Sequence, residues 1–286
     1  MVNSVKIIEC PRDAMQGIKS HFIPTETKAK YINSLLKVGF DTIDFGSFVS
    51  PKAIPQMRDT AEVLSKLDLS STTSKLLAIV ANVRGANDAS QFEEIDYLGY
   101  PFSISENFQM RNTHKTIDQS IDTLKEVLAI ANRTNKEVVA YLSMGFGNPY
   151  GDPWSVEIVG EWTEKLSSFG VKILSLSDTI GSSTPEDIDY LFSNLIPSYP
   201  QIEFGAHLHT TPTKWHEKVD SAFKAGCRRF DGAIKGYGGC PMAKDELTGN
   251  MPTEKLLSYF TANKVATNIK PMSFESAYNK ALEVFL

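Results

Sequence analysis

Cysteine is scarce in this chain, which has three cysteines among 286 residues and no C-x-x-C pair. The small, odd number excludes a disulfide scaffold, and the lack of paired thiols argues against a thiolate zinc site. The three residues are Cys10, Cys227 and Cys240. This use of cysteine fits a protein of the reducing cytoplasm, which is the location we expect.

Long apolar runs and an excess of positive charge are also missing. No stretch of about 18 apolar residues occurs, so no membrane span is expected. The opening segment MVNSVKIIEC lacks the basic and then apolar order of a signal peptide, and none is predicted. The formal net charge of −5 argues against nucleic acid or an anionic membrane as the main partner. An anionic ligand would need a local basic pocket.

What the chain does contain is an alternation of short β-branched runs with amphipathic helical segments. Eight runs have the composition of strands: Val5–Glu9, Thr42–Phe45, Leu76–Ala81, Ile95–Leu98, Val138–Ser143, Ile173–Ser177, Ile202–His207 and Arg229–Ala233. Their number and spacing predict an α/β fold, a (β/α)8 TIM barrel, as one domain over residues 1–286. An open doubly wound sheet would need a G-x-G-x-x-G turn after its first strand, and this chain has none there.

Helix signals agree with this alternation. Thr184 and Pro185, followed by two acidic residues, form a strong helix start, because the hydroxyl caps the first turn and proline is tolerated there. A last amphipathic segment, at about residues 273–284, predicts a C-terminal helix that packs on the barrel.

Polar residues gather where the predicted strands end. In a TIM barrel the C-terminal ends of the strands form one face, and the loops of that face carry the chemistry. The residues at these ends include Glu9, Arg12, Asp13, Asp44, Ser47, Tyr141, Ser143, Ser175, Asp178, His207 and His209. Any one of them could cap a helix or lie in a solvated loop, but their coincidence at one rim indicates a functional site.

The pair His207 and His209 is the first candidate for metal binding. Alternate residues of a strand share a face and lie about 7 Å apart, so both imidazoles point the same way. An H-x-H pair alone is more often a surface or core feature than a metal site. Together with Asp13 and the amide of Asn250, it makes a mixed nitrogen and oxygen site that suits Mg²⁺, Mn²⁺ or another divalent cation better than structural zinc.

Arg12 precedes this aspartate and would be repelled by a cation unless an anion lay between them. We therefore interpret Arg12 as a group for negative charge on a substrate, such as an enolate or a carboxylate. The alternative is a local ion pair with Asp13 in a loop. After the eighth strand, the segment G-Y-G-G-C-P carries Cys240 on a flexible backbone. That thiol either exchanges a proton in the site or belongs to a tight turn.

Seven motifs occur in a specific order along the chain: E-C-P-R-D-A-M-Q, F-G-S-F-V-S-P-K, P-Q-M, S-L-S-D-T-I-G, A-H-L-H, G-G-C-P and T-G-N-M-P-T-E. Together they resemble those of the 3-hydroxy-3-methylglutaryl-CoA lyase (HMG-CoA lyase) family, over about residues 5–260. The resemblance implies a metal-dependent carbon–carbon lyase that cleaves this acyl-CoA substrate to acetyl-CoA and acetoacetate. A homodimer or a higher homo-oligomer is an open expectation.

The resemblance also implies roles for individual residues. Metal ligands would be Asp13, His207, His209 and Asn250. Catalytic residues would be Arg12, which stabilises the thioester enolate, with Asp44, Asp178 and Cys240. Pocket residues would be Gln16, Ser47, Tyr141 and Ser175.

Four positions depart from the family pattern. Ala14 and Ser177 stand where the family usually has glycine, Asp44 where it has glutamate, and Thr210 where it has an acid. These changes surround the ligands and leave the ligand set intact. They keep open a second possibility, a related lyase or condensing enzyme for another 3-hydroxyacyl-CoA or a 2-oxo acid. A third is a non-catalytic barrel that keeps a metal or binds a partner.

Overall fold

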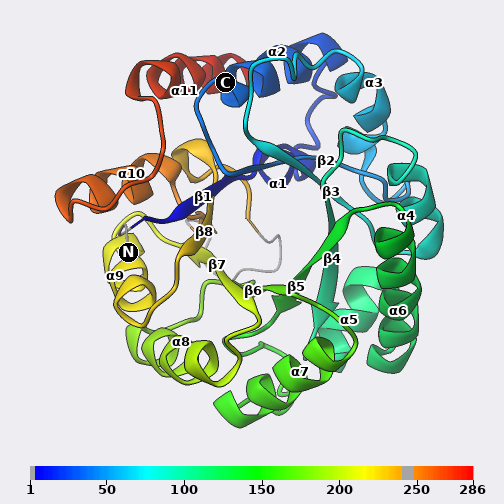
Figure 1. Cartoon of the computed structure of the whole chain (residues 1–286), viewed down its shortest axis with the longest axis vertical. Coiled ribbons are helices and arrows are strands. Elements are labelled where there is room, and N and C mark those ends of the chain that lie inside the picture. Colours follow the sequence, from blue (N-terminus) through cyan, green and yellow to red (C-terminus); the bar gives the residue numbers. More distant parts are fainter. Residues whose placement is uncertain (1–3, 240–247, 286) are drawn as a thin grey trace.

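The fold is a closed barrel of parallel strands inside a ring of helices, as the sequence predicts. It comes from a computed structural model that describes residues 4–239 and 248–285. The barrel strands are β1 (Lys6–Glu9), β2 (Thr42–Ser47), β3 (Lys75–Ile79), β4 (Tyr97–Ser103), β5 (Glu137–Ser143), β6 (Ile173–Asp178), β7 (Glu203–Thr210) and β8 (Arg229–Gly232). Each strand pairs in parallel with the next, and β8 pairs with β1 to close the barrel (Figure 1).

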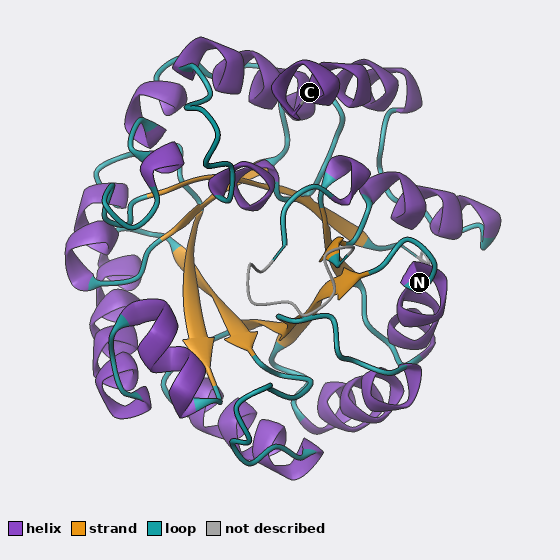
Figure 2. Ribbon diagram, turned by 180° about the vertical axis from the view of Figure 1, so that it is seen from behind, coloured by secondary structure: helices purple, strands orange, loops and turns teal. Residues whose placement is uncertain are grey.

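Helices cover the outside of these strands (Figure 2). The outer helices are α2 (Thr25–Leu36), α3 (Thr60–Leu64), α4 (Val83–Ala89), α5 (Glu106–Thr113), α6 (Ile117–Arg133), α7 (Val156–Ser168), α8 (Pro185–Ser198), α9 (Trp215–Lys224), α10 (Thr253–Ala262) and α11 (Pro271–Phe285). Short 3-10 helices span Pro55–Met57 and Ile234–Gly236. Within the described residues, no helix has the length and apolar character that a membrane crossing needs.

The predicted helix signals are confirmed. The Thr184 hydroxyl accepts a hydrogen bond from the Asp187 N–H at the start of α8. The C-terminal helix α11 begins at Pro271, two residues before the predicted start, and lies beside α2 at the edge of the molecule (Figure 1). Its Phe285 ring meets Tyr31 of α2 edge-on, with ring centres 6.0 Å apart. The extension therefore covers the outer helical layer.

The fourth strand differs most from its predicted bounds, because it runs from Tyr97 to Ser103 and contains Gly99 and Pro101. Both residues are unusual inside strands. Gly99 leaves room for the Ile79 side chain, whose terminal methyl would lie 2.5 Å from a Cβ at this position. Pro101 lacks an N–H to donate, but the pairing with β3 ends at Gly99, so that side of β4 no longer needs one.

The core has two parts. Most buried apolar side chains lie between the strands and the helices. A smaller cluster packs on the opposite face of β3 to β6, inside the barrel, and includes Leu77, Val139 and Ile173. The strands β8, β1 and β7 instead carry buried polar groups, among them Asp231 on β8. The polar side of the interior is where the predicted site lies.

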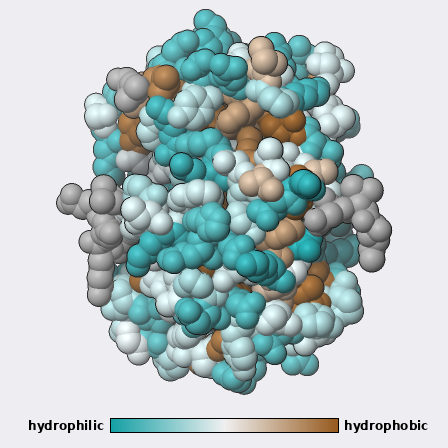
Figure 3. Space-filling view, turned by 90° about the vertical axis from the view of Figure 1, so that its left-hand side faces the viewer, coloured by the Kyte–Doolittle hydropathy of each residue, from teal (hydrophilic) through white to brown (hydrophobic). Residues whose placement is uncertain are grey.

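The surface is mixed on the side of the molecule that carries α9, α10 and α11. Hydrophobic side chains reach that surface among hydrophilic ones (Figure 3). Met272, at the start of α11, is 78% exposed, the highest exposure among the large apolar residues that the structure describes.

Candidate active site

The site lies at the C-terminal ends of the barrel strands, where a cavity of about 400 Å³ opens. Eight of the residues predicted from the sequence line this mouth cavity: Arg12, Asp13, Gln16, Ser47, Tyr141, Ser143, His207 and His209. A larger cavity, of about 770 Å³, lies among the loops that follow β5, β6 and β7, and none of the predicted site residues lines it. The mouth cavity is therefore the candidate active site.

Arg12 and Asp13 reach this cavity from a short helix, α1 (Pro11–Gln16), that begins directly after β1. The helix lies at the barrel opening, inside the ring of outer helices (Figure 2). Pro11 occupies its first turn, where a missing N–H costs nothing. Ala14 lies within this helix and has ordinary helical backbone, so its replacement of the family glycine adds no backbone strain.

The four predicted metal ligands come together at the mouth. One ligand atom each from Asp13, His207 and His209 lies within 4.8 Å of the other two. The amide of Asn250 donates to Asp13 Oδ2 over 2.7 Å. Asn250 belongs to a two-residue strand, β9 (Gly249–Asn250), which pairs antiparallel with the end of β7. We refer to these four residues as the metal site, because the sequence predicts that they bind a cation.

The two imidazoles are oriented for a cation. His207 Nδ1 lies 3.0 Å from Asp231 Oδ2, and His209 Nδ1 lies 2.9 Å from the carbonyl oxygen of Thr179. Each contact fixes the ring and leaves Nε2 as the free ligand atom, as is usual for metal-bound histidines. His209 Nε2 is buried and has no hydrogen-bond partner among the described residues. A cation would satisfy it, so the residues present fit the metal that the sequence predicts.

The ionisable side chains of the metal site shift one another's pKa values. Burial raises the pKa of Asp13, but Arg12 and the two histidines outweigh it and leave that pKa below its usual value. Burial lowers the pKa of His207, but the contact with Asp231 raises it, and the raising effects together are larger. The pKa of His207 therefore lies above its usual value. Burial and the neighbouring His207 charge lower the pKa of His209. A carboxylate and a neutral His209 imidazole are the forms that bind a cation.

Arg12 is balanced by two carboxylates. Its Nε and Nη2 lie 3.0 and 2.6 Å from Asp44 Oδ2, and its Nη1 lies 3.2 Å from Asp13 Oδ1. The sequence interpretation needed an anion between the guanidinium and the cation, and Asp13 and Asp44 supply that negative charge without substrate. Burial raises the pKa of Asp44 to about 6, against the lowering effect of Arg12.

Asp13 is held from three sides. Besides Arg12 and Asn250, the Gln16 amide donates to Asp13 Oδ1. Gln16 lies one helical turn after Asp13 on α1, which explains the contact. The predicted pocket residue Gln16 therefore also positions a metal ligand.

Among the predicted pocket residues, Ser175 lies away from the mouth cavity. Ser175 is fully buried below it, and its Oγ lies 3.5 Å from Asp231 Oδ2. Ser177 is the next residue on the same face of β6, closer to the end of the strand, and it lines the cavity instead. Ser47 and Tyr141 do line it, and the Tyr141 hydroxyl is buried without a partner among the described residues.

Asp178 faces away from the cavity, toward the outer helices. It accepts hydrogen bonds from the Ser183 hydroxyl and from Lys218 Nζ, the latter at 2.6 Å. Lys218, on α9, also donates to the backbone carbonyl of His209 at 2.9 Å. The structure thus gives Asp178 an indirect contact with the metal site and no place in the cavity wall.

The loop after β8 is described only up to Gly239, so the predicted Cys240 lies outside the described residues. Gly238 has φ of +85° and packs on α1, where a Cβ would come within 2.8 Å of the Ala14 Cα. Only glycine fits this position. Gly239 lines the mouth cavity, so the loop reaches the site as expected.

Sequence reasoning missed Asp231, which holds His207. The signal was present, because an acidic residue in the middle of a buried strand rarely occurs without a partner. Glu9 was placed at the rim, but it is fully buried and accepts hydrogen bonds from the Thr253 hydroxyl at 2.6 Å and from the Ile234 N–H at 2.8 Å. These two hydrogen bonds connect β1 to the 3-10 helix Ile234–Gly236, which precedes the glycine-rich loop, and to α10.

The chain is similar to known proteins over nearly its whole length. A family model described as HMGL-like matches residues 5–280. The hydroxymethylglutaryl-CoA lyase YngG of Bacillus subtilis is 34% identical over 91% of this chain and 86% of its own length. The crystal structure of the Bacillus subtilis HMG-CoA lyase has a TM-score of 0.91 at 33% identity and covers 99% of this chain and 95% of its own.

A third comparison concerns an HMG-CoA lyase from Acinetobacter baumannii, solved in complex with coenzyme A and 3-methylmalate. It has a TM-score of 0.89 at 28% identity and covers 99% of this chain and 91% of its own. The family model, the curated relative and the two solved structures each match most of this chain. The chain belongs to the HMGL-like family, together with the hydroxymethylglutaryl-CoA lyases.

Proposed function

We propose that this protein is a divalent-metal-dependent carbon–carbon lyase that cleaves 3-hydroxy-3-methylglutaryl-CoA to acetyl-CoA and acetoacetate. The observation that carries the proposal is the mouth of the barrel, where the metal site lies next to the buried guanidinium of Arg12. The names of its relatives support the same activity. The proposed cation is Mg²⁺ or Mn²⁺, because the ligand set contains two oxygens and two nitrogens and no thiolate.

Asp13, His207, His209 and Asn250 would hold the cation. When bound, it acts as a Lewis acid that lowers the pKa of the substrate's tertiary alcohol and fixes the substrate's oxygens. Asp231 and the Thr179 carbonyl keep the two imidazoles in place, and Gln16 keeps the Asp13 carboxylate in place. These contacts exist before substrate arrives, so the side chains need little reorganisation when substrate binds.

Arg12 acts on the charge that develops during bond cleavage. The electrons of the broken carbon–carbon bond move to the thioester, and the guanidinium stabilises the enolate oxygen that results. Its two contacts with Asp44 fix its orientation. Asp44 is thus a positioning residue for Arg12.

A base must accept the proton of the tertiary alcohol, and an acid must return one to the enolate carbon. We propose Cys240 for one of these transfers, because its loop enters the cavity at Gly239. Ser47 and Tyr141 contact the substrate, and Tyr141 contributes a hydroxyl without a competing partner. Asp178 supports the strand of the histidines through Lys218.

The substrate class is an acyl-CoA, which the coenzyme A complex of the Acinetobacter relative supports. We propose that the protein forms a homodimer or a higher homo-oligomer and that it is located in the cytoplasm. We expect neither nucleic acid nor a membrane as a partner. One domain over residues 1–286 stays a prediction.

A second candidate is a related lyase or condensing enzyme for another 3-hydroxyacyl-CoA or a 2-oxo acid. It is favoured by Ser177, which places a hydroxyl in the cavity wall where the family usually has none. A new hydroxyl changes which acyl groups bind well. The ligands and Arg12 would serve either substrate.

One assay tests the proposal. The purified protein is incubated with 3-hydroxy-3-methylglutaryl-CoA and Mg²⁺ or Mn²⁺, with and without a chelator, and acetoacetate is measured. We expect product that the chelator abolishes. Product only from other acyl-CoA or 2-oxo acid substrates would support the second candidate, and no product from any of them would indicate a non-catalytic barrel.

A further inference from the structure

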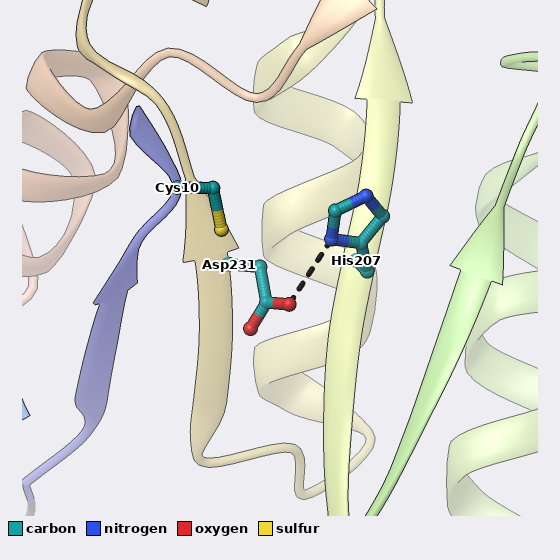
Figure 4. A group of neighbouring side chains, drawn as sticks. All are labelled: Cys10, His207 and Asp231. Atoms are coloured by element: carbon teal, nitrogen blue, oxygen red, sulfur yellow. Dashed lines mark hydrogen bonds and ion pairs between the residues drawn. The ribbon is translucent and has the colours of Figure 1, made fainter. Parts of the chain in front are cut away.

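A second group of metal-ligating side chains lies next to the metal site. Cys10 follows β1, Asp231 lies on β8 and His207 lies on β7, so the three come from neighbouring strands. One ligand atom from each lies within 4.8 Å of the other two. Figure 4 shows the thiol and the imidazole turned toward the carboxylate between them. We call these residues the thiol cluster.

Two residues of the thiol cluster are closed to solvent, and one of their polar atoms has no partner among the described residues. Cys10 is 1% exposed and Asp231 is 3% exposed. Asp231 Oδ2 contacts His207 Nδ1, but Asp231 Oδ1 is buried with no hydrogen-bond partner among the described residues. A buried carboxylate oxygen without a partner is costly, and a bound cation would satisfy it.

We propose that the thiol cluster is a second cation site, which takes a borderline ion such as Zn²⁺ in preference to Mg²⁺. Sulfur, nitrogen and oxygen from three side chains are ligands that zinc accepts together, with one coordination position left open, whereas Mg²⁺ prefers oxygen alone. With ordinary zinc bond lengths the ligand atoms would lie roughly 3.3–3.6 Å apart. Ligand atoms at the 4.8 Å limit would therefore have to approach one another by about 1.2–1.5 Å.

The surrounding charge favours a cation here. The carboxylates of Asp231, Asp44 and Asp13 all act on the Cys10 sulfur, and the Arg12 guanidinium is a neighbouring positive charge. The three carboxylates outnumber this guanidinium, so negative charge near the sulfur favours a dication over an anion. Binding forms the sulfur–zinc bond as the S–H bond breaks, and the thiol proton leaves to solvent.

The thiol cluster and the metal site share His207. A neutral imidazole has one free nitrogen lone pair, so the ring serves one cation at a time. In the structure Nδ1 faces Asp231 and Nε2 is free for the metal site. Zinc in the thiol cluster would take Nδ1, move the ring proton to Nε2 and remove one ligand from the metal site. Zinc would then compete with the catalytic cation without occupying its position.

Cobalt reports thiolate ligation directly, because a sulfur–Co²⁺ bond gives a charge-transfer band in the near ultraviolet. The full-length protein, freed of metal with a chelator, is titrated with Co²⁺ and then with Zn²⁺. We expect one thiolate band per chain, which Zn²⁺ removes and excess Mg²⁺ does not. Cys10→Ala should lose the band, whereas Cys227→Ala and Cys240→Ala should keep it.

His209→Ala separates the two sites, since it removes a ligand of the metal site alone and should leave the band intact. Cys10→Ser checks the result with a side chain of nearly the same size, and circular dichroism confirms that each variant is folded. Absence of the band in the unmodified protein, or its survival in folded Cys10→Ala, would overturn the proposal. The spectrum does not depend on turnover, so a failed lyase assay leaves this test unaffected.

Discussion

Asn250 lies directly opposite His209, in the antiparallel pairing of β9 with the end of β7. The pairing returns the chain from the glycine loop to the strand that bears both histidines. The Asn250 amide also donates to the carbonyl of Tyr237 at 2.8 Å and to Asp13 at 2.7 Å. Backbone pairing, rather than a free loop, therefore sets the position of Asn250, the fourth ligand that we propose.

Replacing Asn250 with alanine should weaken cation binding. Loss of a partner one step removed from a metal typically costs about 10–100-fold in affinity, and loss of a ligand should cost at least as much. Calorimetric titration with Mn²⁺ measures the change. Asn263→Ala, at the end of α10, is the matched control and should bind Mn²⁺ as the unmodified protein does. Equal affinities for the two variants would contradict the assignment.

Arg12→Gln should lower turnover far more than cation affinity. Removing one preorganised donor from a developing oxyanion typically costs about 10²–10³ in kcat. The variant also leaves Asp44 as an unpaired buried carboxylate, which destabilises by about 3–5 kcal/mol. Acetoacetate formation and urea unfolding measure the two effects separately.

The double variant Arg12→Gln/Asp44→Asn distinguishes stability from catalysis. It removes the unpaired charge, so most of the unfolding free energy should return. Turnover should stay low, because the enolate still lacks its guanidinium. Recovery of turnover in the double variant would mean that Arg12 acts only by holding the fold.

Asp178→Asn and Lys218→Met should have similar effects, since both break one buried ion pair of 2.6 Å. Each should destabilise by about 3–5 kcal/mol, and the double variant should cost less than their sum. Both should also lower Mn²⁺ affinity, because Lys218 holds the backbone of His209. The pH profile of kcat should keep its shape in Asp178→Asn; a lost limb would instead indicate direct proton transfer by Asp178.

Glu9 should make the fold less stable at high pH. Burial raises its pKa from 4.5 to about 8, against hydrogen bonds from Thr253 and Ile234 that lower it. The folded chain therefore binds one more proton than the unfolded chain between pH 4.5 and about 8. This stabilisation is complete below pH 4.5 and is lost as pH rises through about 8.

The free energy of unfolding should consequently fall across that window by up to about 1.4 kcal/mol per pH unit from this group. Glu9→Gln keeps the shape of the side chain and removes the titration, so its curve should be flatter. Urea unfolding at several pH values measures the slope. Glu283→Gln, on the exposed side of α11, serves as the control. Equal slopes for Glu9→Gln and the unmodified protein would refute the prediction.

The strands and the shared face of the two histidines could be predicted from the sequence because they depend on short-range patterns. Alternation within a strand tells which side chains share a face, so His207 and His209 were placed together correctly. It does not tell how deep each lies. Ser175 and Ser177 share the inner face of β6, yet only Ser177 reaches the cavity.

Contacts between strands were harder to predict, because they depend on register. The Arg12–Asp44 pair needs α1 to turn back over β2, and the His207–Asp231 contact depends on how β7 and β8 align. The strand β4 was cut short in the prediction because Gly99 and Pro101 usually end strands. Here the early end of β3 and the nearby Ile79 make both acceptable.

The bond between Asn250 and Asp13 joins residues 237 positions apart. A ribosome makes the aspartate early and the asparagine almost last, so a growing polypeptide has no complete cation cage during most of its synthesis. The N-terminal strand also waits for β8 before its second edge is covered. Binding of the proposed cation by all four residues therefore requires that nearly the whole chain has been synthesised.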